Sequence, residues 1–248
     1  MTRRRKTPMN TAIAFVRSVL FYLVYGPTMV VFGTLSCTIG LLMPYKMRQN
    51  VITWANAIII KWLNISCGIT LKVDGLENIP NTPCVVLSKH QSGWETFYLQ
   101  RLLRPVSTIL KKELFWIPFF GWGLYFMHPI AIDRSNPREA MKQILSQGKT
   151  RLAEGNNILI YPEGTRTPAG QVGNYGRSGA ALAIAAGVPV VPVAQNSGYC
   201  WPAHTFIKWP GQIHVSFGQP IDTTDSNSKD LTEQVKEWIE NTQKTLLH

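Results

Sequence analysis

The stretch Cys84-Val85-Val86-Leu87-Ser88-Lys89-His90-Gln91-Ser92-Gly93-Trp94-Glu95-Thr96-Phe97 decides the fold and supplies the first candidate site. Its first four residues form a continuous apolar run, which is typical of a strand buried on both faces. The polar residues and glycine that follow predict a turn. We expect a helix to begin near Trp94, so that Glu95 lies in the first turn, where the helix dipole favours a carboxylate. The stretch therefore predicts a strand, a turn carrying His90 and a helix carrying Glu95.

His90 and Glu95 are spaced so that the turn would bring an imidazole and a carboxylate together. A carboxylate on one ring nitrogen fixes the tautomer and leaves the other nitrogen free to accept a proton. Such a pair activates a hydroxyl without a serine or cysteine nucleophile. The alternative is that Glu95 is only a first-turn residue and His90 only a loop residue.

Short apolar runs alternate with helical segments from Ile69 onward. Further strands are expected at 69–73, 157–161 and 188–194, and helices at 94–103, 137–154, 178–186 and 231–246. Alternating strands and helices indicate an α/β fold with crossover connections. We expect one α/β domain over residues 65–248, with a mostly parallel central sheet flanked by helices. No repeat or linker marks a second domain within it.

Residues 1–64 are predicted to form an N-terminal hydrophobic helical segment associated with a membrane. No charged side chain occurs between Arg17 and Lys46, a length that could span a bilayer once. Gly26-Pro27 favours two shorter helices instead, because proline suits the first turn of a helix better than its interior. Basic residues on both flanks, including Arg3 to Lys6, also favour a hairpin dipped into one leaflet with both ends cytoplasmic. A further helix is expected at about 46–63.

Composition points to an anionic partner. The net charge is +11, although charged residues make up only 16% of the chain. Nucleic acid and an anionic membrane surface are the two candidate partners. Beyond the N-terminal cluster the basic residues are dispersed, and no nucleic-acid motif occurs, so membrane lipids are favoured. The four cysteines form no Cys-x-x-Cys pair, which predicts reduced, buried thiols rather than metal ligands.

Two further motifs contain candidate site residues. In Pro162-Glu163-Gly164-Thr165-Arg166, the glycine permits a tight turn and the arginine suits a phosphate or carboxylate. The alternative is a surface pair between Glu163 and Arg166. Because ligand sites gather at the carboxyl ends of parallel strands, we expect this motif beside His90. The lysines at the start of Lys111 to Gly121 precede an uncharged aromatic run, which is either core or a membrane interface near the active site.

The ordered blocks together resemble the glycerolipid acyltransferase superfamily. They are His-x4-acid at His90, Lys-x-Glu-Leu at Lys111, Ile-Asp-Arg ending at Arg134, Pro-Glu-Gly-Thr-Arg at 162–166, and Val-Pro-Val-Val-Pro-Val at 188–193. Within the superfamily the chain looks most like bacterial 1-acyl-glycerol-3-phosphate (lysophosphatidate) acyltransferases. The resemblance covers about 69–197, and the Glu-Gly-Thr-Arg block is its most specific part.

The resemblance implies an enzyme that moves an acyl group from acyl-CoA or acyl-carrier protein to the free hydroxyl of 1-acyl-glycerol-3-phosphate, giving phosphatidate. His90 would be the general base and Glu95 would orient it. The implied substrate-binding residues are Lys111, Arg134, Glu163, Gly164, Thr165, Arg166 and Arg177, with Arg166 on the acceptor phosphate. No metal or bound cofactor is required. The implied location is a membrane, at the cytoplasmic face of the bacterial inner membrane.

Two residues depart from the family pattern. The acid is Glu95, where the family usually has aspartate, and Gly176 occupies a place where the family commonly has lysine. The neighbouring Arg177 would supply the missing charge, or the acceptor differs. Two alternatives therefore stay open: an O-acyltransferase for another lysolipid, such as lyso-ornithine lipid, and a non-catalytic membrane lipid-binding protein.

Overall fold

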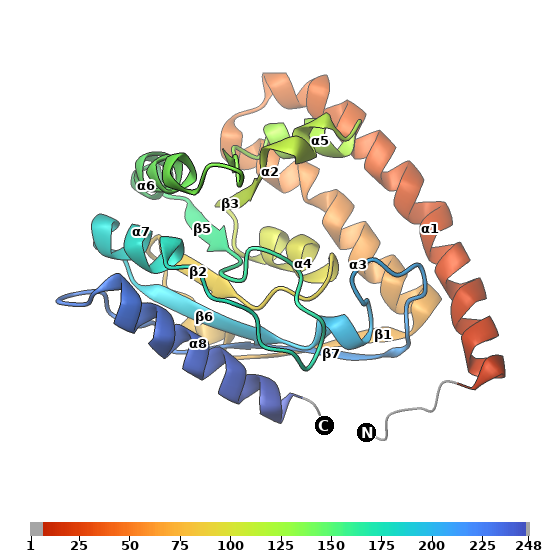
Figure 1. Cartoon of the computed structure of the whole chain (residues 1–248). Helices are drawn as coiled ribbons and strands as arrows, with labels where there is room; N and C mark the ends of the chain where they lie inside the picture. The colour runs from red at the N-terminus through yellow and green to blue at the C-terminus, as the bar shows by residue number, and fades with distance from the viewer. Residues whose placement is uncertain (1–6, 247–248) are drawn as a thin grey trace.

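Figure 1 shows the computed structural model, which describes residues 7–246, as a central sheet between two layers of helices. The basic cluster Arg3 to Lys6 lies outside the described residues. The strands are β1 Ile69–Asp74, β2 Val85–Ser88, β3 Val106–Lys111, β4 Ile130–Ile132, β5 Asn157–Ile160, β6 Val190–Gln195 and β7 Gly211–Phe217. The α-helices are α1 Pro8–Cys37, α2 Tyr45–Ile52, α3 Trp54–Cys67, α4 Trp94–Leu102, α5 Phe120–Tyr125, α6 Pro137–Ala153, α7 Ser178–Ala186 and α8 Ser228–Thr245. Short 3-10 turns lie at η1 Ile39–Leu42, η2 Leu76–Asn78, η3 Lys112–Trp116 and η4 Ser197–Tyr199.

The sheet confirms the predicted α/β class. Its strand order is β1-β7-β6-β2-β5-β3-β4, and the pairs are parallel except for antiparallel β6–β7. In register, Val85 of β2 pairs with Ile158 of β5 on one side and with Val190 of β6 on the other. Because β2 to β6 run in one direction, their carboxyl ends meet at one edge of the sheet.

Successive side chains of the central strands point to opposite faces of the sheet, and each face is covered by a layer of helices. Val85 and Leu87 of β2 pack into the core formed with α6, α7 and α8, whereas Val86 packs into the core formed with α1, α3 and α4. Every residue of β2 and β6 is buried. The continuous apolar runs that predicted these strands are therefore explained by helices on both faces.

The predicted break at Gly26-Pro27 is wrong, because α1 runs unbroken from Pro8 to Cys37. A proline inside a helix costs about 3 kcal/mol. Both halves of α1 pack on the domain and offset that cost. Before the proline, Phe21 is fully buried in the core. After it, Gly33 lies so close to the Phe119 backbone that an added Cβ would come within 2.4 Å of the Phe119 carbonyl oxygen.

The expected helix at 46–63 is two helices, α2 and α3, divided at Thr53. The Thr53 hydroxyl donates to the Gln49 carbonyl at 2.7 Å, and Arg101 donates to the Thr53 carbonyl at 3.0 Å. Side chains therefore compete with the helical ladder at this point. The boundary expected between residues 64 and 65 falls inside α3 and stays a prediction.

Candidate functional site

The predicted motifs gather at the edge where the parallel strands end. His90 follows β2, Lys111 ends β3, Arg134 follows β4 and the loop containing Glu163 follows β5. These residues line one cavity of about 1050 Å³. The expectation that the His90 and Glu163 motifs open onto the same edge is confirmed, since β2 and β5 are parallel neighbours.

His90 and Glu95 are in contact. The Nδ1 atom of His90 lies 2.9 Å from Oε1 of Glu95, whose side chain is completely buried. Because a carboxylate only accepts hydrogen bonds, Nδ1 carries the proton and Nε2 is the basic nitrogen. Burial alone would raise the pKa of the Glu95 carboxyl, but the hydrogen bonds that it accepts from His90 and Ser92 outweigh burial and hold this pKa below its usual value.

The Glu95 carboxylate accepts four further hydrogen bonds. Oε1 accepts from the backbone N–H groups of Gln91 and Ser92, each at 2.7 Å. Oε2 accepts from the hydroxyls of Ser92 and Ser197, at 2.5 and 2.7 Å. Five donors thus surround one carboxylate, which fixes its orientation toward His90.

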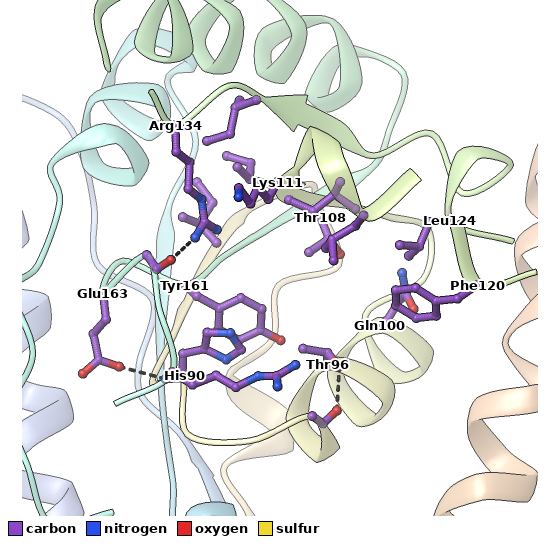
Figure 2. Close-up of a pocket in the computed structure, with 18 of the residues that line it drawn as sticks. His90, Thr96, Gln100, Thr108, Lys111, Phe120, Leu124, Arg134, Tyr161 and Glu163 are labelled. Carbon is purple, nitrogen blue, oxygen red and sulfur yellow. Dashed lines mark hydrogen bonds between the residues drawn. The ribbon is translucent and has the colours of Figure 1, made fainter. Parts of the chain in front are cut away.

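The loop after β5 holds His90 from the other side. The His90 N–H donates to Oε2 of Glu163 at 2.9 Å, and the His90 carbonyl accepts from the N–H of Thr167 at 2.8 Å. The imidazole stacks on the ring of Tyr161, with ring centroids 4.1 Å apart (Figure 2). Burial raises the pKa of the Tyr161 hydroxyl, so this neighbour stays neutral.

The Glu163 carboxylate accepts hydrogen bonds from other residues of the protein. Its Oε1 accepts from the ammonium of Lys89 at 2.7 Å and from the N–H of Gly173 at 3.2 Å. The side chains of both Lys89 and Glu163 are buried. The alternative of a surface pair between Glu163 and Arg166 is therefore wrong, since the partner of Glu163 is Lys89.

Three of the four predicted cationic residues line the cavity, and Arg177 does not. Lys111, Arg134 and Arg166 line the cavity together with Gly164. The Arg134 guanidinium donates to the carbonyl of Gly164, which ties the loops after β4 and β5 together (Figure 2). Gly164 has a φ of +68°, a left-handed conformation that glycine adopts without strain.

Thr165 and Arg177 are exposed and lie outside the lining of the cavity. Gly176, the position where the resemblance leads one to expect lysine, does line the cavity. The structure thus brings six of the nine predicted site residues to the cavity wall and adds Glu95 directly behind His90.

Much of the remaining cavity wall is apolar, although polar residues such as Thr96, Gln100 and Thr108 also line it. Toward α1 and α5 the wall is formed by Met29, Val30, Phe97, Phe119, Phe120 and Leu124. Toward α6 it is formed by Ile109, Ile132, Ala140, Met141, Ile144 and Ile160. Cations beside apolar walls suit an amphiphilic ligand with an anionic head group and a hydrocarbon chain. Within residues 7–246, no cluster of three or more histidine, cysteine, aspartate or glutamate side chains is arranged to hold a metal ion.

Several residues of the site were not predicted from the sequence. From the sequence alone, Tyr161 is only the last residue of an expected strand, and Ser197 is only the last residue of the matching region. An ion pair of Lys89 could have been predicted, because a lysine directly after a buried strand is itself buried and then needs a carboxylate partner. Nothing in the local pattern marks Ser197, which is brought to Glu95 by the fold over 102 positions.

The chain is similar to known acyltransferases in sequence and in fold. The sequence model of the acyltransferase family matches residues 70–196, just over half of the chain. A 1-acyl-sn-glycerol-3-phosphate acyltransferase of Pseudomonas aeruginosa is 44% identical over 240 residues, which are 94% of this chain and 92% of that protein. A chloroplastic 1-acyl-sn-glycerol-3-phosphate acyltransferase of Brassica napus is 32% identical over 64% of this chain, and the match spans about half (48%) of that protein. The crystal structure of a 1-acyl-sn-glycerophosphate acyltransferase from Thermotoga maritima has the same fold, with a TM-score of 0.80 at 23% identity, covering 96% of this chain and 98% of that one.

Proposed function

Because this chain belongs to the acyltransferase family, we propose that it transfers an acyl group to the free hydroxyl of 1-acyl-sn-glycerol-3-phosphate, giving phosphatidate. The observation that carries the proposal is the pair of His90 and buried Glu95, 2.9 Å apart, at a cavity that combines cations with apolar walls. The name of the Pseudomonas aeruginosa relative supports the choice of acceptor.

The chemistry needs one base. Nε2 of His90 removes the proton of the acceptor hydroxyl, and the oxygen attacks the thioester carbonyl of acyl-CoA or acyl-carrier protein. The tetrahedral intermediate then collapses, the carbon–sulfur bond breaks, and the imidazolium returns the proton to the departing thiolate. Glu95 stabilises the imidazolium between these steps. General-base catalysis of this kind contributes about 10²–10⁴-fold.

The cations at the cavity would bind the acceptor phosphate. Arg166 is the main candidate, because its planar guanidinium matches phosphate geometry, and Lys111 and Arg134 are secondary candidates. Among the predicted binding residues, Glu163 and Gly164 are proposed to act by shaping the loop, because Glu163 accepts a hydrogen bond from Lys89 and Gly164 accepts one from Arg134. We assign no phosphate contact to Thr165 or Arg177, which lie outside the lining.

Membrane association is part of the proposal. The helix α1 is long and apolar enough to cross a membrane, and residues such as Val16 and Leu23 are exposed on it. The same helix contributes Met29 and Val30 to the cavity wall. A lysolipid could therefore pass between membrane and cavity along α1. We expect the protein to lie at the cytoplasmic face of the bacterial inner membrane.

An acceptor and donor screen tests the proposal. Purified full-length protein is offered lysophosphatidate, other lysophospholipids and lyso-ornithine lipid, each with acyl-CoA or with acyl-carrier protein, and products are identified by mass spectrometry. The expected result is phosphatidate as the main product. Turnover restricted to another lysolipid would replace the acceptor, and the lack of turnover with every pair would favour a lipid-binding protein.

A further inference from the structure

The C-terminal helix α8 lies beyond residues 70–196, the part matched by the family, yet two of its side chains contact the loop that carries His90. We propose that α8 positions His90 for catalysis, with Glu240 holding Lys89 and Gln243 holding Gln91. The inference rests on the proposed function of His90. Glu240 and Gln243 are three residues apart, so they lie on the same face of the helix.

The first contact is ionic. The Lys89 ammonium lies 2.7 Å from Oε1 of Glu240, 2.7 Å from Oε1 of Glu163 and 3.0 Å from the carbonyl oxygen of Gln171. All three of its protons are therefore used. Glu240 also accepts from the hydroxyl of Tyr175 at 2.7 Å. A buried ammonium is stable only when it is paired, so Glu240 is one of the two anions that keep Lys89 in place.

This ion pair is connected to the His90 backbone. Glu163, the second partner of Lys89, uses its other carboxylate oxygen to accept from the N–H of His90 at 2.9 Å. The order of contacts is thus Glu240, Lys89, Glu163 and the His90 N–H. Loss of the Glu240 carboxylate frees Lys89 to move. It therefore disturbs the ion pair between Lys89 and Glu163, the only one that Glu163 forms among the described residues.

The second contact is on the other side of His90. The amide of Gln91 donates to Oε1 of buried Gln243 at 3.2 Å, and Gln243 donates to the carbonyl of Gln195 at 2.5 Å. The backbone N–H of Gln91 in turn donates to the Glu95 carboxylate at 2.7 Å. Gln243 therefore supports the same carboxylate that orients the imidazole.

Positioning has a kinetic signature that packing alone lacks. A displacement of about 1 Å at a reacting group can lower the rate roughly 10²-fold. Neither Glu240 nor Gln243 lines the cavity, so neither side chain contacts the substrate directly. We therefore expect their loss to lower kcat while KM for lysophosphatidate stays unchanged.

The first test compares Glu240→Ala with Glu237→Ala in the full-length protein. Glu237 is an exposed glutamate one turn earlier on the same helix and serves as the matched control. We expect Glu240→Ala to lower kcat about 10- to 100-fold, with KM within about twofold, and Glu237→Ala to match the wild type. Glu240→Gln should restore part of the rate, because its amide oxygen can still accept from Lys89. A Glu240→Ala protein with wild-type kcat would overturn the inference.

The second test covers the case in which Glu240→Ala does not fold. Gln91→Ala, Gln243→Ala and the double variant form a double-mutant cycle on kcat, with the folded fraction measured by circular dichroism. If Gln243 acts through Gln91, its effect on kcat disappears in the Gln91→Ala background. Equal effects in both backgrounds, or none in either, would refute positioning through Gln91. A wild-type protein without acyltransferase activity would instead refute the proposed function, which separates the two failures.

Discussion

Replacing Glu95 by glutamine would remove a buried charge while keeping its shape. Three N–H groups, from His90, Gln91 and Ser92, point at Oε1 of Glu95, and two hydroxyls, from Ser92 and Ser197, point at Oε2. A glutamine can keep its carbonyl oxygen at the first position and place its NH₂ group against the hydroxyls. Because hydroxyls can turn to accept, the variant is expected to fold.

The size of the effect follows from the contact distance. With Nδ1 of His90 2.9 Å from the carboxylate oxygen, the centres of the two charges are about 4 Å apart when the imidazole is protonated. At an effective dielectric constant of about 20, their attraction is about 4 kcal/mol. That attraction exists only while the imidazolium exists, so its loss should lower kcat about 10³-fold. KM for lysophosphatidate should stay within about threefold, because Glu95 does not line the cavity.

Release of coenzyme A from acyl-CoA in mixed micelles measures this effect, with lysophosphatidate varied to separate kcat from KM. Glu95→Asp is the companion variant, because it keeps the charge but shortens the reach, and we expect a loss of about tenfold. Melting temperatures report whether each variant is folded. A folded Glu95→Gln protein whose kcat is within tenfold of the wild type would refute the assigned role of the charge.

Three further predictions concern other parts of the molecule. Arg166→Gln should raise KM for lysophosphatidate roughly 10- to 100-fold with little change in kcat, whereas exposed Arg177→Gln should leave both unchanged; equal effects would contradict the phosphate assignment. Burial lowers the pKa of Lys208 to about 8 in the folded protein, whereas a lysine in the unfolded chain has a pKa of about 10.4. Between these two pH values the unfolded state binds more protons than the folded state, so the stability of the fold rises with pH. The melting temperature of the wild type relative to Lys208→Met should therefore increase from pH 7 to 9.5, and a constant difference would count against this. Replacing exposed Leu20 and Leu23 of α1 by serine should lower partitioning into anionic vesicles at least about tenfold, measured by flotation; unchanged flotation would remove α1 from the membrane contact.

The sequence predicted the elements whose pattern is local. The apolar run ending at Leu87, the helix start at Trp94 and the contact of His90 with Glu95 all follow from a strand-to-helix turn. The strands β3, β4 and β7 were not predicted. β4 has only three residues, too few for a distinct apolar run, whereas the alternation of Ile213, Val215 and Phe217 with polar residues in β7 is typical of a half-buried strand and could have been used.

The parts of the site that depend on distant contacts could not be predicted. Lys89 is paired with Glu240 across 151 positions, and Ser197 reaches Glu95 across 102. Such pairs are fixed by how layers pack, and spacing along one segment carries no information about them. The error at Pro27 has the same origin, because packing on both sides of the proline overrides a local preference.

The role of His90 as the base is tested most directly by phosphatidate formation in a His90→Ala protein, followed by mass spectrometry with lysophosphatidate and acyl-CoA. His214→Ala, a substitution on β7 outside the cavity lining, is the control. We expect His90→Ala to lose at least about 10²-fold in kcat while the control keeps wild-type activity. A folded His90→Ala protein that forms phosphatidate at a rate within tenfold of the wild type would contradict the account.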